Sequence, residues 1–305
     1  MNPILIKLGG YQKPASVHNQ AATLFGKVLR QQLGNRIEFE LIGDVLQLGR
    51  KSGDLLPMVE GGELSICYMS TVRFTPAVPE FRLLELPFVV TDRNVVNSAL
   101  DADFGDFLKR RVRDTTPYRV LAFWDNGFRH FSNSVRPIRT PADCRGLRIR
   151  TQMSELHGEV FRALGFEPIA TDVKDFVEQI ASGKFQAQDN PLTNIYNFGI
   201  HRHHRYITLS GHFFGASALA CNEALYQSWP EEVRSAVDAA AREATALQRR
   251  LAVAQDTQVL EQLDPNDNEV IRLTATEHAA FTAAVQPVLA KYRKKIDPRL
   301  FSHLE

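Results

Sequence analysis

Hydrophobic and polar positions alternate along residues 1–123 with two different periods, which predicts strands and helices in turn. Four segments have the pattern of strands: residues 4–8, 37–41, 64–68 and 118–123. Three have the pattern of helices, ending at glycine or polar residues: residues 16–33, 52–59 (with Ser52 as the expected cap) and 91–111. Alternation of this kind predicts a mostly parallel α/β sheet.

The second part of the chain continues the pattern and adds one long helix. The expected strands are residues 129–133, 147–150, 205–209, 216–222 and 270–273. The expected helices are residues 154–164, 172–182, 190–198, 230–263 and 276–292. Pro230 followed by two glutamates is a favourable helix start, and no glycine or interior proline follows before residue 263. Such a helix would be roughly 50 Å long, so we expect it to bridge two lobes.

The segment from Gly146 to Pro191 carries the candidate chemistry. Leu147 and Ile149 alternate with Arg148 and Arg150, so the two arginines share one face of a strand. Arg150 ends that strand just before a turn and the next predicted helix, the place where open α/β sheets bind ligands. A guanidinium group matches a carboxylate with two parallel hydrogen bonds. The residues alone leave a second interpretation open, in which Arg150 is a structural arginine paired with a neighbouring acid.

Composition narrows the class of protein without naming it. At 305 residues the chain is long enough for two domains, and 44% apolar with 23% charged residues is an ordinary globular composition. A net charge of +1 provides no basic surface for nucleic acid or anionic membrane. The apolar run near residues 83–90 is short and contains Glu85 and Pro87, so no segment is expected to span a bilayer. Met1 leads directly into a strand pattern, which indicates a cytoplasmic protein or a mature form whose leader has been removed.

The three cysteines do not form a recognisable framework. Cys67, Cys144 and Cys221 are far apart and odd in number, and no CxxC pair occurs. Cys67 and Cys221 lie in apolar strand patterns, so we expect buried thiols there.

Seven short motifs occur in an order and spacing that can be compared with a known family. They are Ser16-Val17-His18, Gly61-Gly62-Glu63-Leu64, Leu86-Pro87-Phe88, Asn126-Gly127-Phe128-Arg129, Gly146-Leu147-Arg148-Ile149-Arg150, Gln188-Asp189-Asn190-Pro191 and Trp229-Pro230. On these motifs the chain resembles the substrate-binding proteins of tripartite ATP-independent periplasmic (TRAP) transporters over essentially its whole length.

The resemblance implies an α/β fold with two lobes that close like a clamshell on a ligand in the cleft between them. Residues 1–123 with about 212–250 would form the first lobe, and residues 124–211 with about 251–305 the second. The family's selectivity arginine corresponds to Arg150, which would form a salt bridge to the ligand carboxylate. The family's asparagine before proline corresponds to Asn190, whose amide would add a donor without a second charge to desolvate.

The resemblance also points to further ligand contacts. Arg129 matches a family arginine near the site, although an ion pair with Asp125 or Asp189 would explain it equally well. Tyr11 falls where the family's first loop faces the ligand, and its alternative is an aromatic residue resting on the first helix.

Five other positions follow from the same comparison. Tyr68, Ser70 and Arg73 occupy the region where sialate-binding members carry an acid and an arginine, and the acid is missing at Ser70. Phe213 and Phe214 replace polar residues at the entry of a strand. They would make the cleft more apolar than a sugar acid requires, or they belong to the core near the hinge.

The expected function is therefore binding without chemistry. The protein would be a monomer without a cofactor that captures a small organic anion in the periplasm, its signal peptide removed, and delivers it to the integral membrane permease subunits of the transporter. A compact mono- or dicarboxylate is the first expected ligand, with an aromatic acid ahead of a sugar acid. No enzymatic activity and no nucleic-acid partner are expected.

Two alternatives stay open from the residues alone. His201, His203 and His204 form a dense cluster, and on a strand the first two would share a face and could hold zinc in a metal-dependent enzyme. No HExxH motif or matched cysteine pair accompanies them, so a solvated basic loop is the favoured interpretation. The other alternative is a clamshell ligand sensor without a transport role.

Overall fold

A computed structural model describes residues 3–304 of the chain. The chain divides into two compact units, each assembled from three separate segments. Unit 1 comprises residues 3–78, 100–125 and 216–255, and unit 2 comprises residues 79–99, 126–215 and 256–304. The lobe boundaries and the ligand cleft expected from the sequence stay predictions.

Unit 1 contains a mixed sheet with the strand order β2-β1-β3-β8-β4. Its strands are β1 (Ile4–Gly9), β2 (Ile37–Ile42), β3 (Ile66–Ser70), the first part of β4 (Tyr118–Asn133) and the last part of β8 (Tyr206–Asn222). Strand β1 pairs in parallel with β2 and β3, and β3 pairs antiparallel with β8. The helices are α1 (Val17–Leu33), α2 (Leu55–Glu60), α4 (Asp103–Thr115), α8 (Glu223–Ser228) and most of α9 (Glu231–Gln262).

Unit 2 contains the order β9-β8-β4-β7-β5-β6. Its own strands are β5 (Arg148–Thr151), β6 (Glu167–Ala170), β7 (Ala187–Pro191) and β9 (Glu269–Arg272). Strand β5 is parallel to β6 and β7, whereas β7 is antiparallel to β4. The helices are α5 (Glu155–Ala163), α6 (Val173–Gln179), α7 (Leu192–Asn197), α10 (Ala275–Arg293) and most of α3 (Arg93–Asp101).

Short 3-10 turns join these elements. They are Gly34–Arg36, Val45–Leu48, Ser52–Asp54, Thr71–Phe74, Pro79–Glu85, Pro141–Cys144, Ile180–Ser182, Ile200–Arg202 and Pro298–His303. No helix within residues 3–304 is long and apolar enough to cross a membrane.

Helix α1 shows how the hydrophobic pattern produces the packing. Ser16 caps the helix, because its hydroxyl oxygen accepts a hydrogen bond from the backbone N–H of Asn19 at 3.2 Å. Phe25 and Leu29 lie one turn apart and are completely buried. Each contributes roughly 1.5–3 kcal/mol by leaving water. Gly34 ends the helix with a φ of 54°, a left-handed value that favours glycine.

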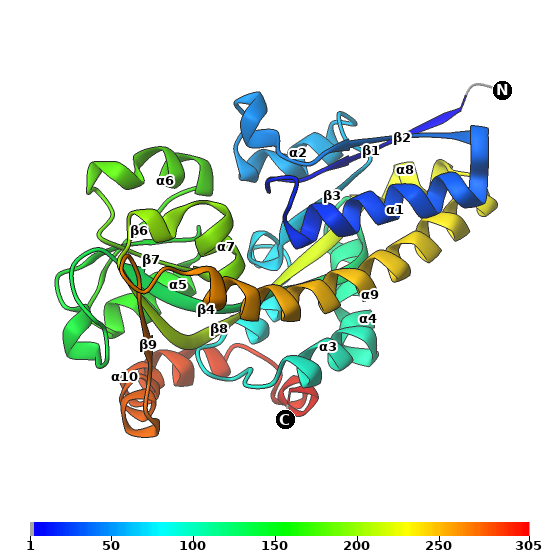
Figure 1. The fold of residues 1–305 in the computed structure, drawn as a ribbon. Coiled ribbons are helices and arrows are strands. Elements are labelled where there is room, and N and C mark those ends of the chain that lie inside the picture. Colours follow the sequence, from blue (N-terminus) through cyan, green and yellow to red (C-terminus); the bar gives the residue numbers. More distant parts are fainter. Residues whose placement is uncertain (1–2, 305) are drawn as a thin grey trace. The chain divides into compact units, whose positions relative to one another are not determined.

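Two long strands replace four expected short ones. The segments 118–123 and 129–133 belong to the single strand β4, and the segments 205–209 and 216–222 belong to β8 (Figure 1). Between two of these segments, Gly215 allows a close backbone approach inside the sheet. A Cβ atom at Gly215 would lie 3.2 Å from the carbonyl oxygen of Gly127. Strands β4 and β8 and helix α9 each contribute residues to both units, as expected for α9.

Three further expectations were wrong in detail. Residues 91–111 form two helices, because Ala102 is extended and a Cβ at Gly105 would lie 1.9 Å from the carbonyl oxygen of Leu100. Ser52 is not a helix cap, since it begins a 3-10 turn that precedes α2. The segment 190–198 is helical only from Leu192, because residues 187–191 pair as strand β7.

Candidate functional site

Arg150 lies near the end of β5, next to a capped helix. Its side chain is almost completely buried, its Nε donates to the carbonyl oxygen of Thr171 at 2.9 Å, and its guanidinium carbon lies 5.4 Å from the ring centre of Phe176. Ser154 caps α5 by accepting the backbone N–H of His157 at 3.3 Å. The sequence prediction of a strand end followed by a capped helix is therefore confirmed.

Asn190 is buried on the neighbouring strand β7. Arg150 is paired in register with Gln188, two positions before Asn190. Because side chains alternate along a strand and paired positions point the same way, Arg150, Gln188 and Asn190 share one face of the sheet in unit 2. The Asn190 Nδ2 donates to Gln188 Oε1 at 2.5 Å, and the Asn190 Oδ1 accepts from Asn194 Nδ2 at 3.5 Å. The structure thus brings the two main predicted carboxylate contacts onto adjacent strands.

Arg129 forms a buried ion pair with Asp189. Its Nε lies 2.5 Å from the Asp189 carboxylate, and its Nη2 donates to the Asp189 backbone oxygen at 2.5 Å. The imidazole of His212 lies 3.5 Å from the same carboxylate. Burial alone would raise the pKa of Asp189, but Arg129 and His212 hold that pKa well below its usual range. The structure contains the alternative ion pair with Asp189, and a contact of Arg129 with ligand stays a prediction.

The two predicted phenylalanines are both buried within unit 2. Phe213 stacks on His157, with ring centres 4.2 Å apart and planes 13° apart. Phe214 meets Phe128 edge to face at 5.4 Å. Both rings thus contact aromatic neighbours of their own unit, and a ligand contact for either stays a prediction.

In unit 1 the predicted residue Tyr68 joins the loop after β1 to helix α1. Its hydroxyl oxygen accepts from the backbone N–H groups of Tyr11 and Gln12 at 3.2 and 3.1 Å, and it donates to Asn19 Oδ1 at 3.1 Å. Burial raises the pKa of Tyr68 well above its usual value. Tyr11 itself is buried, with its ring centre 5.7 Å from that of Tyr68. Tyr68 therefore fixes the position of the loop that carries Tyr11.

Ser70 and Arg73 follow on the same chain segment. Ser70 is the last residue of β3 and is buried, whereas Arg73 is half-buried in the turn Thr71–Phe74. The guanidinium group of Arg73 lies against Gly53, where an added Cβ would be 3.4 Å from its nearest nitrogen. Their contacts with ligand stay predictions.

The histidine cluster does not lie on a strand. Its first residues form the 3-10 turn Ile200–Arg202, so the strand that the zinc alternative requires, with His201 and His203 on one face, is not present there. His201 stacks on Tyr196 at 4.6 Å, His203 is exposed, and His204 is buried with its Nδ1 3.0 Å from Ser132 Oγ. Among residues 3–304, no group of three or more histidine, cysteine or acidic side chains could hold a metal ion.

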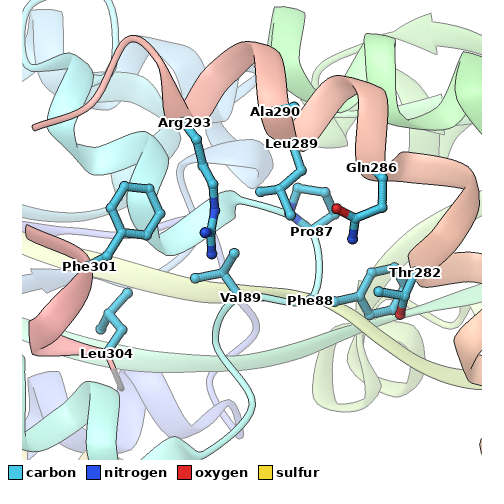
Figure 2. Close-up of a pocket in the computed structure, with 10 residues that line it drawn as sticks. All are labelled: Pro87, Phe88, Val89, Thr282, Gln286, Leu289, Ala290, Arg293, Phe301 and Leu304. Carbon is cyan, nitrogen blue, oxygen red and sulfur yellow. The ribbon is translucent and has the colours of Figure 1, made fainter. Parts of the chain in front are cut away.

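A separate pocket of about 360 Å³ lies in unit 2. Figure 2 shows it between helix α10, the segment around Phe88 and the C-terminal turn, with Arg293 and Phe301 at one end. Phe88 has a φ of 60°, an uncommon value for a residue with a side chain, and its N–H donates to the carbonyl oxygen of His212 at 3.0 Å. None of the nine predicted ligand-binding residues lines this pocket.

Acid should destabilise the protein, because four histidines, three of them buried and His130 half-buried, are neutral in the folded chain. Burial lowers the pKa of His18, His204 and His212 to about 4 and that of His130 to about 3, against 6.5 for an exposed histidine. Between pH 6.5 and 4 the unfolded chain binds more protons at these groups, so the free energy of unfolding falls as the pH falls. Each histidine contributes up to about 1.4 kcal/mol per pH unit in this window.

Urea unfolding at pH 8, 7, 6 and 5 measures this loss. We expect nearly constant stability above about pH 6.5, the ordinary histidine pKa, and a steep loss below it. The variant His203→Gln, which changes an exposed histidine, should retain the same slope. A stability that rises between pH 6.5 and 5 would contradict buried neutral histidines.

Comparison with known proteins identifies the kind of molecule that this geometry belongs to. Residues 8–295 match the profile of the bacterial extracellular solute-binding proteins, family 7. The chain is 26% identical to the 2,3-diketo-L-gulonate-binding periplasmic protein YiaO of Escherichia coli, over 87% of this chain and 79% of that protein. It is 24% identical to the C4-dicarboxylate-binding periplasmic protein DctP of Rhodobacter capsulatus, over 96% of this chain and 88% of that protein.

Solved structures show the same similarity. A TRAP periplasmic solute-binding protein from Sulfurospirillum deleyianum with bound succinate has a TM-score of 0.93 and 25% identity, covering 100% of this chain and 99% of that one. The sugar acid binding protein of Advenella mimigardefordensis in complex with galactonate also has a TM-score of 0.93, at 21% identity, covering 100% and 97% of the two chains.

Proposed function

The chain belongs to family 7 of the bacterial extracellular solute-binding proteins, and from this premise we propose that Arg150 and Asn190 hold the carboxylate of its ligand. The family consists of binding proteins of TRAP transporters, so the protein is not an enzyme. It has the two-lobed α/β fold expected from the sequence. Its ligands are small organic anions that it passes to membrane permease components.

One observation supports the two residues above others. Arg150 and Asn190 share a face at the carboxyl ends of the parallel strands β5 and β7. Ligands of open α/β sheets bind at such ends. The guanidinium group offers charge and a planar pair of donors, and the asparagine amide offers another donor without a second charge. Together they suit the two oxygens of one carboxylate.

We propose a compact mono- or dicarboxylate as the ligand, with an aromatic acid ahead of a sugar acid. The succinate bound to the S. deleyianum protein supports a compact diacid, and the buried aromatic residues Phe213 and Phe214 favour an apolar ligand over a sugar acid. Sugar acids should be tested in parallel, because one relative is a 2,3-diketo-L-gulonate-binding protein and one similar structure holds galactonate. We further propose that the protein acts in the periplasm, after removal of its leader, as a monomer.

A thermal-shift screen against organic acids, sugar acids and amino acids tests this function. A ligand that binds only the folded state adds about 2.7 kcal/mol of stability at a hundredfold excess over its dissociation constant. We expect large shifts with carboxylates and none with the corresponding amides. Equal shifts with an acid and its amide would contradict a carboxylate-binding site.

A further inference from the structure

A chain of hydrogen bonds leads from Asn190 to His204 through the buried interior of unit 2. The Nδ2 of Asn190 donates to Gln188 Oε1 at 2.5 Å, and Gln188 Nε2 donates to Ser132 Oγ at 2.6 Å. The hydroxyl of Ser132 lies 3.0 Å from His204 Nδ1. All four side chains are buried. We call these four residues the amide relay.

Hydrogen bonds are donated in one direction along the amide relay, from Asn190 toward His204, because each side chain has a fixed number of protons to donate. A glutamine amide accepts at one end and donates at the other, so Gln188 accepts from Asn190 only while it donates to Ser132. The hydroxyl of Ser132 then has its single proton left for His204 Nδ1. That nitrogen accepts if the imidazole is neutral and carries its proton on Nε2.

The burial of His204 meets one condition of this direction, which is a neutral ring. Burial lowers the pKa of His204 to about 4, so the ring is neutral at neutral pH. The backbone around it is held by Asn268, whose Nδ2 donates to the carbonyl oxygens of His201 and His204 at 2.8 and 3.2 Å. His204 is therefore a fixed terminus for the amide relay.

The direction matters for the carboxylate. An asparagine amide that rotates by 180° exchanges its oxygen and its nitrogen, and an amide oxygen repels a carboxylate. With the relay in place, Asn190 Nδ2 uses one proton on Gln188 and keeps the second N–H for the ligand. If the relay ran in the opposite direction, Gln188 would donate to Asn190 Oδ1. The Asn190 Nδ2 would then no longer donate to Gln188 while its second N–H faces the ligand.

We propose that Gln188 is a positioning residue that, through Ser132 and His204, holds the Asn190 amide with its N–H groups toward the ligand carboxylate. This inference rests on the proposed role of Asn190. It assigns a function in ligand selection to three buried polar side chains that do not themselves need to touch the ligand.

Nitrogen NMR of the histidine rings tests the direction without any ligand. We expect the shifts of His204 at pH 7 to show a neutral ring with its proton on Nε2. A proton on Nδ1 would make His204 the donor to Ser132 and leave the Ser132 proton free to bond to Gln188, so nothing would fix the direction of the relay and the inference would be overturned. This measurement does not depend on whether Asn190 binds a carboxylate.

Calorimetric titration tests the effect of the relay on ligand affinity. Succinate is the probe, and pantoate replaces it if succinate gives no thermal shift. The variant Gln188→Met removes both hydrogen bonds at nearly constant size, and we expect it to weaken binding about tenfold, the effect of one hydrogen bond to a charged group. Ser132→Ala should weaken binding similarly, whereas Ser132→Thr keeps the hydroxyl and should restore most of the affinity. If neither probe binds, the NMR result alone decides.

Two controls separate positioning from general stability. Thr208→Val removes another buried hydroxyl of unit 2, which donates to the Ile138 carbonyl at 2.9 Å, and should leave affinity unchanged. In an Asn190→Ala background, Gln188→Met should have no further effect on binding. The inference would be overturned if Gln188→Met weakened ligand binding equally with Asn190 present and in the Asn190→Ala variant. It would also be overturned if Gln188→Met bound the ligand with full affinity while Asn190→Ala bound it weakly. Full affinity of Asn190→Ala would instead refute the proposed function.

Discussion

Replacement of Arg150 by alanine is expected to raise the dissociation constant for the carboxylate ligand by about two to four orders of magnitude. Removing one partner of a buried charge pair costs roughly 3–5 kcal/mol, because the other charge stays buried without compensation. Arg150→Lys should recover only part of the loss, since an ammonium group lacks the planar fork of donors. Calorimetric titration with succinate measures both variants.

Arg148 provides a matched control on the same strand. Its side chain is exposed and donates to the backbone carbonyls of Lys184 and Gly183, both at 2.9 Å. Arg148→Ala should therefore bind the ligand as the unchanged protein does. Equal affinities of the Arg150→Ala variant and the unchanged protein would remove Arg150 from the binding site and return it to a structural role.

The second large effect concerns stability rather than binding. Asp189→Asn should lower the free energy of unfolding by about 3–5 kcal/mol, because it leaves the buried guanidinium group of Arg129 without its counter-charge. Chemical denaturation at pH 7.5 measures the loss. The size of the change follows from the almost complete burial of both side chains, which excludes water as a substitute partner.

A less buried ion pair of the same unit provides a comparison for this loss of stability. Arg93 Nη2 and Asp256 Oδ2 lie 2.5 Å apart, but their side chains are 14% and 27% exposed. Asp256→Asn should cost about 1 kcal/mol, near the upper range for accessible pairs. If the two aspartate variants lose equal stability, burial does not set the strength of the Arg129–Asp189 pair.

The sequence predicted elements well wherever one segment carried its own boundary signal. Ser154 before α5 and Gly34 after α1 are local caps, and both boundaries were confirmed. Strand β6 was not predicted, because its four residues, Glu167–Ala170, include a proline and no fully buried position. Strand β7 was assigned in part to a helix, because its pairing with β4 and β5 comes from distant parts of the chain.

The residues of the candidate site likewise divide into those with a local sequence signal and those that depend on contacts between distant segments. Arg150 and Asn190 could be found from a strand-end pattern and from family motifs that are local in sequence. The roles of Ser132 and His204 could not be found in this way. Ser132 is separated from Gln188 by 56 positions and His204 from Ser132 by 72, and these side chains meet only in the folded unit. A local signal did exist for Gln188, because its spacing of two residues from Asn190 places both side chains on one face of a strand.

The three cysteines create an opportunity for spectroscopy. Cys67, Cys144 and Cys221 are free thiols and are buried, and burial raises the pKa of Cys67 to about 12 and those of the other two still higher. Since only the thiolate form reacts with maleimides, the folded protein should label very slowly. A single cysteine introduced at an exposed position would then take up a fluorophore selectively, and its emission would report ligand-dependent movement without first removing any native thiol.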